Sequence, residues 1–445
     1  MHKGEIDIIT LGCSKNLVDT ERLIRQLELA GYRCVHDPSD AQGEIAIINT
    51  CGFIGDAKEE SIEVILQFAN RKNKGKLRKL YVMGCLSQRY REELPAEIPE
   101  VDQWFGKFDY LGIVEVIGQL DKKEIKPSCR VFERTLTTPK HYAYLKIAEG
   151  CNRYCSYCAI PLITGRFTSR KMEDILDEVR WLVSEGVKEF NVIAQDLSSY
   201  GLDLYGEHRL AQLIDEVASI QGVEWIRIHY TYPTNFPYDL LPVMAKHPNV
   251  CKYMDIALQH CSNNVLKLMR RHITRSEQDA LIERIRKEVP GICIRTTLLV
   301  GHPGETEADF EELCEWVKQM RFDRLGAFAY SEEEGTYSAQ HLKDDVPDEV
   351  KQARLSKLMR LQQQISADVQ QGKVGKQLPV VIDREEGDYL VGRTEYDSPE
   401  VDPEVLIKKV DALGLRPGMF CRAYIESADD FDLYADVIKA GNCGA

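Results

Sequence analysis

Three short apolar runs near the start of the chain each end at a cysteine, and this pattern restricts the possible fold most. The runs cover residues 6–11, 45–49 and 80–83, and segments with helical spacing include 18–30 and 57–70. Repeated strand–helix units of this kind form a parallel sheet with helices on both faces. We therefore predict an α/β protein that begins with a parallel β-α-β domain.

The cysteines at these strand ends are Cys13, Cys51 and Cys85, each preceded by glycine or threonine. In open parallel sheets, ligands bind at the edge formed by the carboxyl ends of the strands. Three buried structural thiols are the alternative, because free cysteine is often buried. Repetition at three equivalent positions favours a three-thiolate cluster site. Cys34 and Cys129 lack this context and are interpreted as structural.

A second group of cysteines has the spacing Cys-x3-Cys-x2-Cys, at Cys151, Cys155 and Cys158. Three thiolates on one loop can hold three corners of a cubane iron–sulfur cluster, which leaves the fourth iron open to bind a small molecule. The alternative is a zinc knuckle, but structural zinc usually takes paired ligands with a second Cys or His pair downstream. No fourth Cys or His follows within twenty residues.

The composition indicates a cytoplasmic protein that is not attached to a membrane. No run approaches the ~20 apolar residues that cross a bilayer, and the first residues lack the pattern of a secretion signal. The 14 cysteines are too dispersed over 445 residues for a disulfide scaffold. The net charge of −14 argues against binding dominated by nucleic-acid phosphates and suits a basic protein partner.

A second strand–helix alternation begins near residue 142, after a polar linker at 121–140 that contains Pro127 and Pro139. The expected strands lie at residues 142–148, 190–194, 225–230, 253–258, 292–300 and 324–330. Helical patterns lie at residues 173–185, 276–289 and 307–320. Six such units predict a partial (β/α)6 barrel rather than a closed eightfold one. The Cys-x3-Cys-x2-Cys loop then follows the first strand, on the face where such barrels carry out catalysis.

A long polar helix at residues 347–371 leads into a region of short alternating strands. These strands are expected at residues 378–382, 389–394, 404–410, 420–427 and 433–438. They predict a small antiparallel β-barrel. From residue 373 onward the chain has nine Lys and Arg against fifteen Asp and Glu, a balance that repels phosphate and attracts a basic protein. The predicted parts of the chain are residues 1–120, a linker at 121–140, residues 141–371 and residues 372–445.

The two groups of cysteines resemble those of a known superfamily. Cys-x3-Cys-x2-Cys is similar to the cluster motif of radical S-adenosylmethionine (SAM) enzymes, and the additional trio resembles the methylthiotransferases among them. The resemblance covers essentially the whole chain and implies a radical SAM barrel followed by a TRAM-like barrel. The run Leu-Gly-Cys-Ser-Lys-Asn-Leu-Val-Asp at residues 11–19 resembles the RimO branch, which modifies an aspartate of a small-subunit ribosomal protein. That branch commonly has Asp-Ser-Glu where residues 19–21 are Asp-Thr-Glu, and the tRNA-modifying MiaB branch usually differs after the first cysteine.

The resemblance implies two 4Fe-4S clusters, one on each group of cysteines, with SAM as a cofactor. One electron passed to the cluster on the Cys-x3-Cys-x2-Cys loop would split SAM into methionine and a 5′-deoxyadenosyl radical, which removes a hydrogen atom from an unactivated carbon. The second cluster would supply or hold the sulfur, and a second SAM would methylate it. The implied partners are the ribosomal protein and a one-electron donor such as flavodoxin or ferredoxin.

We therefore expect a transferase that inserts a methylthio group at the β-carbon of an aspartate in the decoding-centre protein of the small ribosomal subunit. Nucleic acid is not expected as the direct substrate. The alternatives are a tRNA adenosine methylthiotransferase of the MiaB type and a non-catalytic iron–sulfur electron carrier. Cleavage of SAM separates an enzyme from a carrier, and the identity of the modified molecule separates the two enzymes.

Five residues are candidates for contacts with SAM. Tyr157 lies between two of the loop cysteines, where it can pack on adenine or cover the cluster. Gln195 ends the second barrel strand. Arg295 and Thr297 share one face of the fifth strand, although a core or salt-bridge role would equally explain Arg295. Gly301 permits close approach of the backbone to a ligand.

Other polar features have simpler interpretations. His229, His260 and His272 have no ligand spacing and are interpreted as structural. The acidic run at residues 332–334 is interpreted as a solvated loop, with a substrate contact as the alternative.

Overall fold

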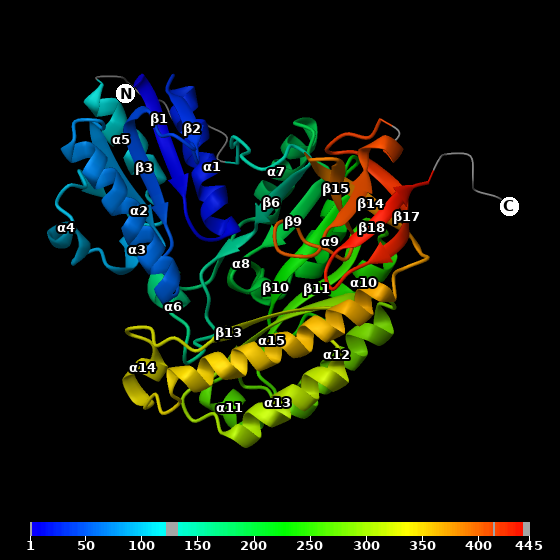
Figure 1. Cartoon of the computed structure of the whole chain (residues 1–445). Coiled ribbons are helices and arrows are strands. Elements are labelled where there is room, and N and C mark those ends of the chain that lie inside the picture. Colours follow the sequence, from blue (N-terminus) through cyan, green and yellow to red (C-terminus); the bar gives the residue numbers. More distant parts are fainter. Residues whose placement is uncertain (1, 122–131, 413, 439–445) are drawn as a thin grey trace.

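The structure is a computed structural model that describes residues 2–121, 132–412 and 414–438. The chain forms a five-stranded sheet in the N-terminal part, a six-stranded sheet in the centre and a closed five-stranded barrel in the C-terminal part. Figure 1 shows these three parts in blue, green and red. The central sheet lies between the other two parts, so both can contribute side chains to it. Within the described ranges, no helix is both long and apolar enough to cross a membrane.

The N-terminal sheet is parallel throughout, with the strand order β2-β1-β3-β4-β5. Its strands are β1 (His2–Thr10), β2 (Arg33–His36), β3 (Gly43–Thr50), β4 (Lys79–Gly84) and β5 (Gln103–Trp104). The three predicted strands are confirmed as β1, β3 and β4. The sequence did not predict β2 and β5, because both are short and neither contains an apolar run.

Helices cover both faces of this sheet because neighbouring residues of a strand point to opposite sides. The helices are α1 (Ser14–Leu29), α2 (Gly55–Asn73), α3 (Cys85–Arg89), α4 (Leu94–Glu97) and α5 (Tyr110–Leu120). Ile47 of β3 packs with α1 and α5. Its neighbour Ile48 packs with α2, α3 and α4. The predicted arrangement with helices on both faces is confirmed.

The central sheet has the order β13-β12-β11-β10-β9-β6, and all neighbouring strands are parallel. Its strands are β6 (Tyr142–Lys146), β9 (Glu189–Ile193), β10 (Trp225–Thr231), β11 (Val250–Gln259), β12 (Cys293–Val300) and β13 (Arg324–Ala329). All six predicted strands are confirmed. Because β6 and β13 form the two edges, the barrel is open, as six rather than eight units require.

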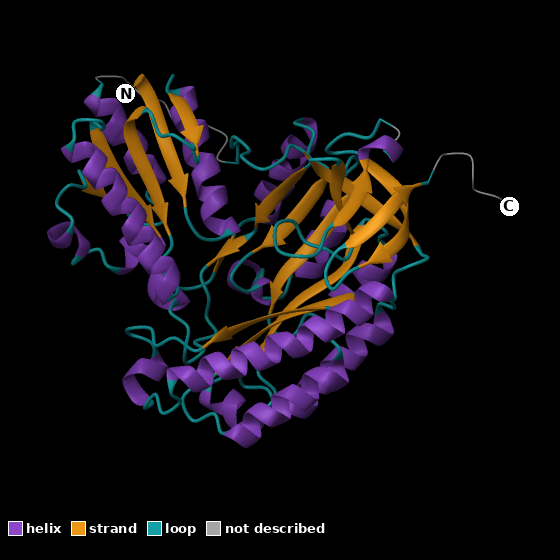
Figure 2. Cartoon of the chain, viewed as in Figure 1, coloured by secondary structure: helices purple, strands orange, loops and turns teal. Residues whose placement is uncertain are grey.

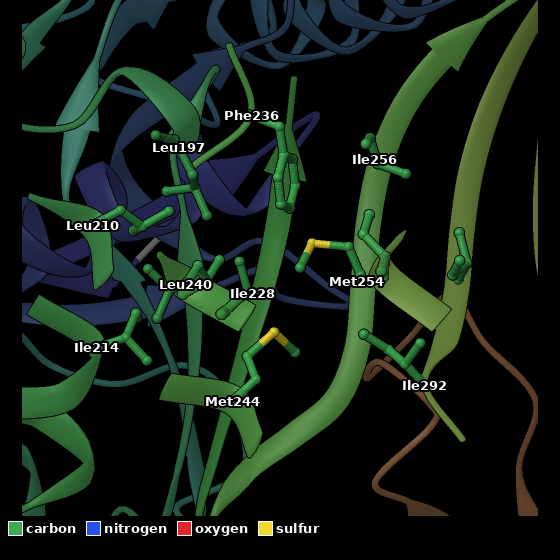
Figure 3. Packing of buried hydrophobic residues seen from close by; sticks show 14 of the residues in the cluster. Leu197, Leu210, Ile214, Ile228, Phe236, Leu240, Met244, Met254, Ile256 and Ile292 are labelled. Atoms are coloured by element: carbon green, nitrogen blue, oxygen red, sulfur yellow. The ribbon is translucent and has the colours of Figure 1, made fainter. Parts of the chain in front are cut away.

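The outer face of the central sheet is covered by helices. These are α7 (Met172–Ser184), α9 (Leu210–Ala218), α10 (Leu240–Lys246), α12 (Arg275–Glu288), α13 (Glu307–Met320) and α15 (Asp348–Gln371). Figure 2 shows the long helices α12, α13 and α15 along one side of the central strands. In Figure 3, Ile228 of β10 and Met254 of β11 lie near Leu240 and Met244 of α10 in the largest apolar cluster.

Shorter elements complete this part of the fold. They are β7 (Ala148–Glu149), β8 (Thr168–Ser169), α6 (Ile160–Thr164), α8 (Leu202–Tyr205), α11 (Asn263–Leu268), α14 (Tyr337–His341) and the 3-10 turn η1 (Leu197–Ser199). Two of them, β7 and α6, flank the Cys-x3-Cys-x2-Cys loop. The loop therefore leaves the sheet at the carboxyl end of β6, as predicted.

The C-terminal strands close into a barrel in the order β14-β15-β16-β18-β17. They are β14 (Gln377–Glu386), β15 (Tyr389–Thr394), β16 (Val405–Lys408), β17 (Phe420–Ala428) and β18 (Leu433–Val437), with the 3-10 turn η2 (Lys409–Asp411) after β16. The five predicted strands are confirmed. Four neighbouring pairs are antiparallel, but β16 and β18 run parallel because β17 lies between them in the chain and reverses its direction. Closure leaves no free sheet edge.

The predicted linker at 121–140 lies partly outside the described residues, together with Cys129. Its described end packs between the N-terminal and central parts. Buried Arg134 pairs with Glu21 of α1 at 2.5 Å and with Glu178 of α7 at 3.2 Å. The segment therefore contacts both parts rather than only connecting them. The domain limits at residues 120, 140 and 371 stay predictions.

Candidate functional site

Cys13, Cys51 and Cys85, here called the sheet-edge cysteines, lie on neighbouring loops. They follow β1, β3 and β4, which are adjacent in the sheet, so their loops emerge side by side at its carboxyl edge. Cys13 is exposed, Cys51 is half-buried and Cys85 is buried. A thiolate charge on Cys13 raises the pKa of Cys51, and thiolate charges on Cys13 and Cys51 raise the pKa of Cys85.

Two glycines allow these loops to approach one another. Gly12 has φ +92°, and a Cβ atom there would lie 2.8 Å from Cβ of Cys51. A Cβ atom on Gly52 would lie 2.8 Å from the carbonyl carbon of Cys85. Contacts under 3.0 Å are closer than real Cβ atoms tolerate, so a side chain at either position would separate the cysteine loops. The three loops therefore lie against one another at the carboxyl edge of the sheet.

Asn16, from the run that follows Cys13, ties the loops together. Its side-chain amide donates to the carbonyl oxygens of Leu11 and Thr50, both at 3.0 Å. Its Oδ1 atom lies 3.6 Å from Sγ of Cys85. Asn16 is buried, so these bonds are shielded from water. One side chain therefore connects the ends of β1 and β3 with the cysteine that follows β4.

A buried lysine that the sequence reasoning missed reaches this site from the fourth loop at the same edge. Lys107, between β5 and α5, places Nζ 3.2 Å from Oδ1 of Asn16 and 3.4 Å from Oδ2 of Asp19. The same Nζ lies 3.7 Å from Oε1 of Glu149, which is in β7 of the central part. Lys146, at the end of β6, pairs with Asp19 and with Glu149. Two carboxylates and two ammonium groups thus join the N-terminal and central parts.

Electrostatics in this buried group favour charged side chains. Burial raises the pKa of Asp19 and Glu149, but Lys146 and Lys107 reverse this effect, so both pKa values are lowered. Burial alone would lower the pKa of Lys107. The negative charges of Asp19 and nearby thiolates outweigh burial, so the pKa of Lys107 is raised. In the sequence, Lys107 stands in the run Trp-Phe-Gly-Lys-Phe, which does not mark it as a site residue.

The thiols respond to the same charges. Burial raises the pKa of Cys85 to about 12, and Lys107 acts in the opposite direction. At Cys13, desolvation by surrounding groups is outweighed by Lys15 and Lys107, so the pKa of this thiol is lowered. Cys13 is therefore the sheet-edge cysteine that most readily becomes a thiolate, the form that binds iron.

Cys151, Cys155 and Cys158, here called the loop cysteines, lie between β7 and α6. Nη1 of Arg271 donates to Sγ of Cys155 at 3.4 Å, and the hydroxyl of Tyr232 lies 3.6 Å from the same sulfur. Burial raises the pKa of Cys151 to about 12. A cavity of about 240 Å³ lies beside Cys155 and Cys158. Hydrogen-bond donors to thiolate sulfur are the contacts through which proteins tune iron–sulfur clusters.

The predicted SAM residues fall into separate neighbourhoods. Tyr157 makes an edge-on contact with His302, with ring centres 6.3 Å apart, and Nε2 of His302 lies 3.1 Å from Oγ of Ser156. Gln195 donates to Glu149, while its Oε1 atom is buried and has no hydrogen-bond partner among the described residues. Tyr157 lies within the loop, between Cys155 and Cys158, and Gln195 reaches the segment before the loop through Glu149.

Arg295 and Thr297 lie on the inner face of β12, as the alternation predicted, and both are half-buried. Arg295 is held in ion pairs with Asp255 at 3.3 Å and Asp402 at 3.5 Å. Gly301 follows β12 with φ +75°, and a Cβ atom there would lie 2.3 Å from Cγ of Lys351 in α15. The group that lies close to the backbone of Gly301 is therefore the side chain of Lys351 in α15.

A loop of the C-terminal barrel closes the amino-terminal end of the central sheet. Glu400 accepts hydrogen bonds from Tyr142 at 2.9 Å and Tyr144 at 3.2 Å, and Asp402 accepts one from Tyr253 at 2.8 Å. These tyrosines lie on strands β6 and β11. The opposite, carboxyl end of the sheet carries the loop cysteines and faces the sheet-edge cysteines.

The acidic run at residues 332–334 is only partly solvated, so the interpretation as a solvated loop was wrong for Glu333. Its carboxylate is buried and pairs with Lys58 at 2.8 Å and Arg89 at 2.7 Å, both from the N-terminal part. Glu332 and Glu334 are exposed. His229 and His260 are buried in ion-pair and packing contacts, in line with a structural role.

The spacing of possible metal ligands differs between a single ion and a cluster. Among the residues that the structure describes, no group of three His, Cys, Asp or Glu side chains is close enough to hold one metal ion. A cubane cluster does not need that spacing, because each thiolate binds a different iron atom. A cation lies near each group of cysteines, with Lys107 acting on Cys85 and Arg271 donating to Cys155.

The fold and site define a radical SAM protein of three parts. Family models match residues 5–106 (Uncharacterized protein family UPF0004), residues 145–317 (Radical SAM superfamily) and residues 374–438 (TRAM domain). The fold resembles solved radical SAM structures at low identity. The methyltransferase TsrM from Kitasatospora setae matches with a TM-score of 0.55 and 13% identity over 76% of this chain and 77% of that chain. The cobalamin-dependent enzyme OxsB matches with a TM-score of 0.52 and 14% identity over 80% of this chain and 56% of that chain.

Full-length relatives identify the family. Proteins named ribosomal protein uS12 methylthiotransferase RimO are 62% identical in Bacteroides thetaiotaomicron, over 99% of both chains, and 58% identical in Parabacteroides distasonis, over 99% of this chain and all of the relative. In Flavobacterium johnsoniae the identity is 50% over 98% of both chains. The chain belongs to the RimO family of radical SAM methylthiotransferases. It is a transferase of the class that works with an iron–sulfur cluster and SAM.

Proposed function

We propose that this chain inserts a methylthio group at the β-carbon of an aspartate in ribosomal protein uS12. The relatives that share up to 62% of its sequence carry that substrate in their name. The observation that carries the proposal is that two converging groups of three cysteines lie on either side of one boundary. Lys107 and Glu149 connect the two sides at 3.7 Å.

The proposal includes two 4Fe-4S clusters. The loop cysteines would hold the cluster that binds SAM, and the sheet-edge cysteines would hold the second. When bound, these groups supply a carbon-centred radical, from SAM and one electron, and a sulfur atom for transfer. The chain itself holds the thiolates in place through Asn16 and the glycine contacts and excludes water by joining its two parts. Arg271 donates to the Cys155 sulfur.

Five residues are proposed as SAM contacts: Tyr157, Gln195, Arg295, Thr297 and Gly301. The support is strongest for Gln195, because its buried Oε1 atom can accept a hydrogen bond from an ammonium or hydroxyl group. Arg295 is already paired with two carboxylates, which supports a role in shaping the inner wall of the barrel. The charge of Arg295 is neutralised by those pairs, so a direct contact with SAM would have to displace one of them.

The acidic C-terminal barrel supports a basic protein as substrate. The excess of Asp and Glu after residue 373 would attract a lysine-rich ribosomal protein and repel RNA. We further propose a one-electron donor such as flavodoxin or ferredoxin and a cytoplasmic location. Both follow from the need for electrons at low potential and from a substrate that is part of the ribosome.

The decisive experiment offers both classes of substrate to one enzyme preparation. The reconstituted protein, SAM and dithionite are incubated without oxygen with uS12 or with tRNA, and the products are weighed by mass spectrometry. We expect replacement of H by SCH3 on one aspartate of uS12 and no change in tRNA. Modification of a tRNA adenosine with unmodified uS12 would overturn the proposal in favour of a MiaB-type enzyme.

A further inference from the structure

Lys107 is a buried cation at the point where the two groups of cysteines meet. Its side chain is 2% exposed. It reaches Cys85 through one intermediate atom, because Oδ1 of Asn16 lies 3.2 Å from Nζ of Lys107 and 3.6 Å from Sγ of Cys85. On the other side, Nζ lies 3.7 Å from Glu149, two residues before Cys151. Burying this ammonium group has a desolvation cost, which its contacts with Asn16, Asp19 and Glu149 offset.

The charges around Lys107 make its contribution specific. Asp19 and Glu149 are negative, and Lys146 pairs with both of them. The four side chains are therefore neutral as a group. Without Lys107, the remaining three carry one net negative charge beside three thiolates. A second lysine, Lys15, lies 3.6 Å above the ring of Tyr230 and acts on the Cys13 thiol, whereas Lys107 acts on both Cys13 and Cys85.

We propose that the positive charge of Lys107 stabilises the electron-rich state of the cluster on the sheet-edge cysteines and so raises its reduction potential. The inference rests on the proposed second cluster. A cubane cluster held by three thiolates is anionic, and one-electron reduction adds a further negative charge. Net charge, hydrogen bonds to sulfur and solvent exposure set the potentials of such clusters. A cation shielded from water acts on this charge more strongly than a surface cation. Lys107 is therefore a positioning residue for sulfur transfer rather than a catalytic one.

The test isolates the second cluster. In a background where the loop cysteines are replaced by alanine, only the sheet-edge cysteines can hold a cluster. The reduction potential is then measured by electron paramagnetic resonance during titration with dithionite and mediators. Lys107→Met and Lys107→Gln remove the charge, and Lys107→Arg keeps it. Lys72→Met is the matched control, because Lys72 is an ion-paired lysine of the same part that bonds to Asp102 and to the carbonyl oxygen of Glu100.

We expect Lys107→Met and Lys107→Gln to shift the potential to more negative values, beyond the scatter set by Lys72→Met, while Lys107→Arg stays near the parent. Loss of the cluster in Lys107→Met and Lys107→Gln, with retention of the cluster in Lys107→Arg, would also support stabilisation of the cluster by the positive charge. Equal potentials in all variants, or loss of the cluster in Arg as well, would overturn the inference alone. A background protein without any iron–sulfur signal would overturn the two-cluster proposal and this inference with it.

Discussion

Oε2 of Glu333 lies 2.7 Å from Nη1 of Arg89, and this pair joins the loop after β13 to the helix that begins at Cys85. Arg89 also donates to the carbonyl oxygen of Gly52, beside Cys51, at 3.0 Å. Its third contact is the carbonyl oxygen of Glu334, at 2.9 Å. One guanidinium group thus connects two sheet-edge loops with the central part.

Glu333→Gln should separate SAM cleavage from methylthio transfer. The change leaves Lys58 and Arg89 without their shared carboxylate, and breaking a buried ion pair costs about 3–5 kcal/mol. We expect the urea midpoint of unfolding to fall and methylthiolation of uS12 to drop well below SAM cleavage, measured as 5′-deoxyadenosine. The exposed neighbour Glu332→Gln is the control. Equal losses of cleavage and transfer would contradict the positioning role.

Replacing each group of cysteines by alanine should produce two different defects. Without the loop cysteines the reconstituted protein should lose about half of its iron and all SAM cleavage, because the open iron belongs to that group. Without the sheet-edge cysteines it should still cleave SAM but transfer no methylthio group. Iron and sulfide analysis, together with product mass spectrometry, checks both. Full transfer by the second variant would disprove a separate sulfur-donating site.

Asn16→Ala should disrupt the sheet-edge site without touching a cysteine. The carbonyl oxygens of Leu11 and Thr50 would lose their buried donor, and each unsatisfied group costs about 1–3 kcal/mol. We expect the Asn16→Ala variant to have a lower midpoint of thermal unfolding and a lower iron content than the parent. The variant should still cleave SAM. Asn73→Ala, at an exposed position, serves as the control. Iron content and stability that match the control would show that Asn16 does not hold the loops.

The sequence predicted the fold well because apolar periodicity is a local signal. All strands that the sequence predicted in the N-terminal and central parts were found. Cys13, Cys51 and Cys85 could be placed at one edge of the sheet from their positions at strand ends alone. Lys107 and Glu333 could not be predicted. Lys58 and Glu333 are 275 residues apart in the chain, and Lys107 and Asp19 are 88 apart. Ion pairs across such distances depend on how the parts pack, and an acidic run is usually solvated.

The contact between the two barrels should weaken in acid. Burial raises the pKa of Asp397, but Lys373, Arg324 and a hydrogen bond from Thr394 outweigh it and lower the pKa to about 2. The folded state therefore binds this proton less readily than the unfolded state, whose aspartate has a pKa near 3.8. The resulting stability, about 2 kcal/mol, is present above pH 4 and is lost as the pH falls toward 2.

The measurement is the urea midpoint between pH 2 and pH 6. Asp397→Asn should be less stable at pH 6 and should lose part of the dependence on pH below 4. Asp368→Asn removes an exposed partner of Arg321 and should keep the parent profile. A parent-like pH profile for Asp397→Asn would show that Asp397 is not the group that titrates.

The final prediction concerns how the acidic C-terminal barrel meets its substrate. Of the three aspartates in the loop before β18, Asp429 and Asp432 accept backbone hydrogen bonds that shape the loop. Asp430 is exposed and pairs with Gln363 at 2.7 Å, so its charge can be changed without breaking the loop. Asp430→Lys should weaken binding of uS12, and Asp430→Asn should weaken it less. Surface attraction is screened by salt, so the difference between these variants should shrink as ionic strength rises. Titration of labelled uS12 at low and high salt measures both effects. Identical affinities for all three proteins at low salt would show that this loop faces away from the substrate.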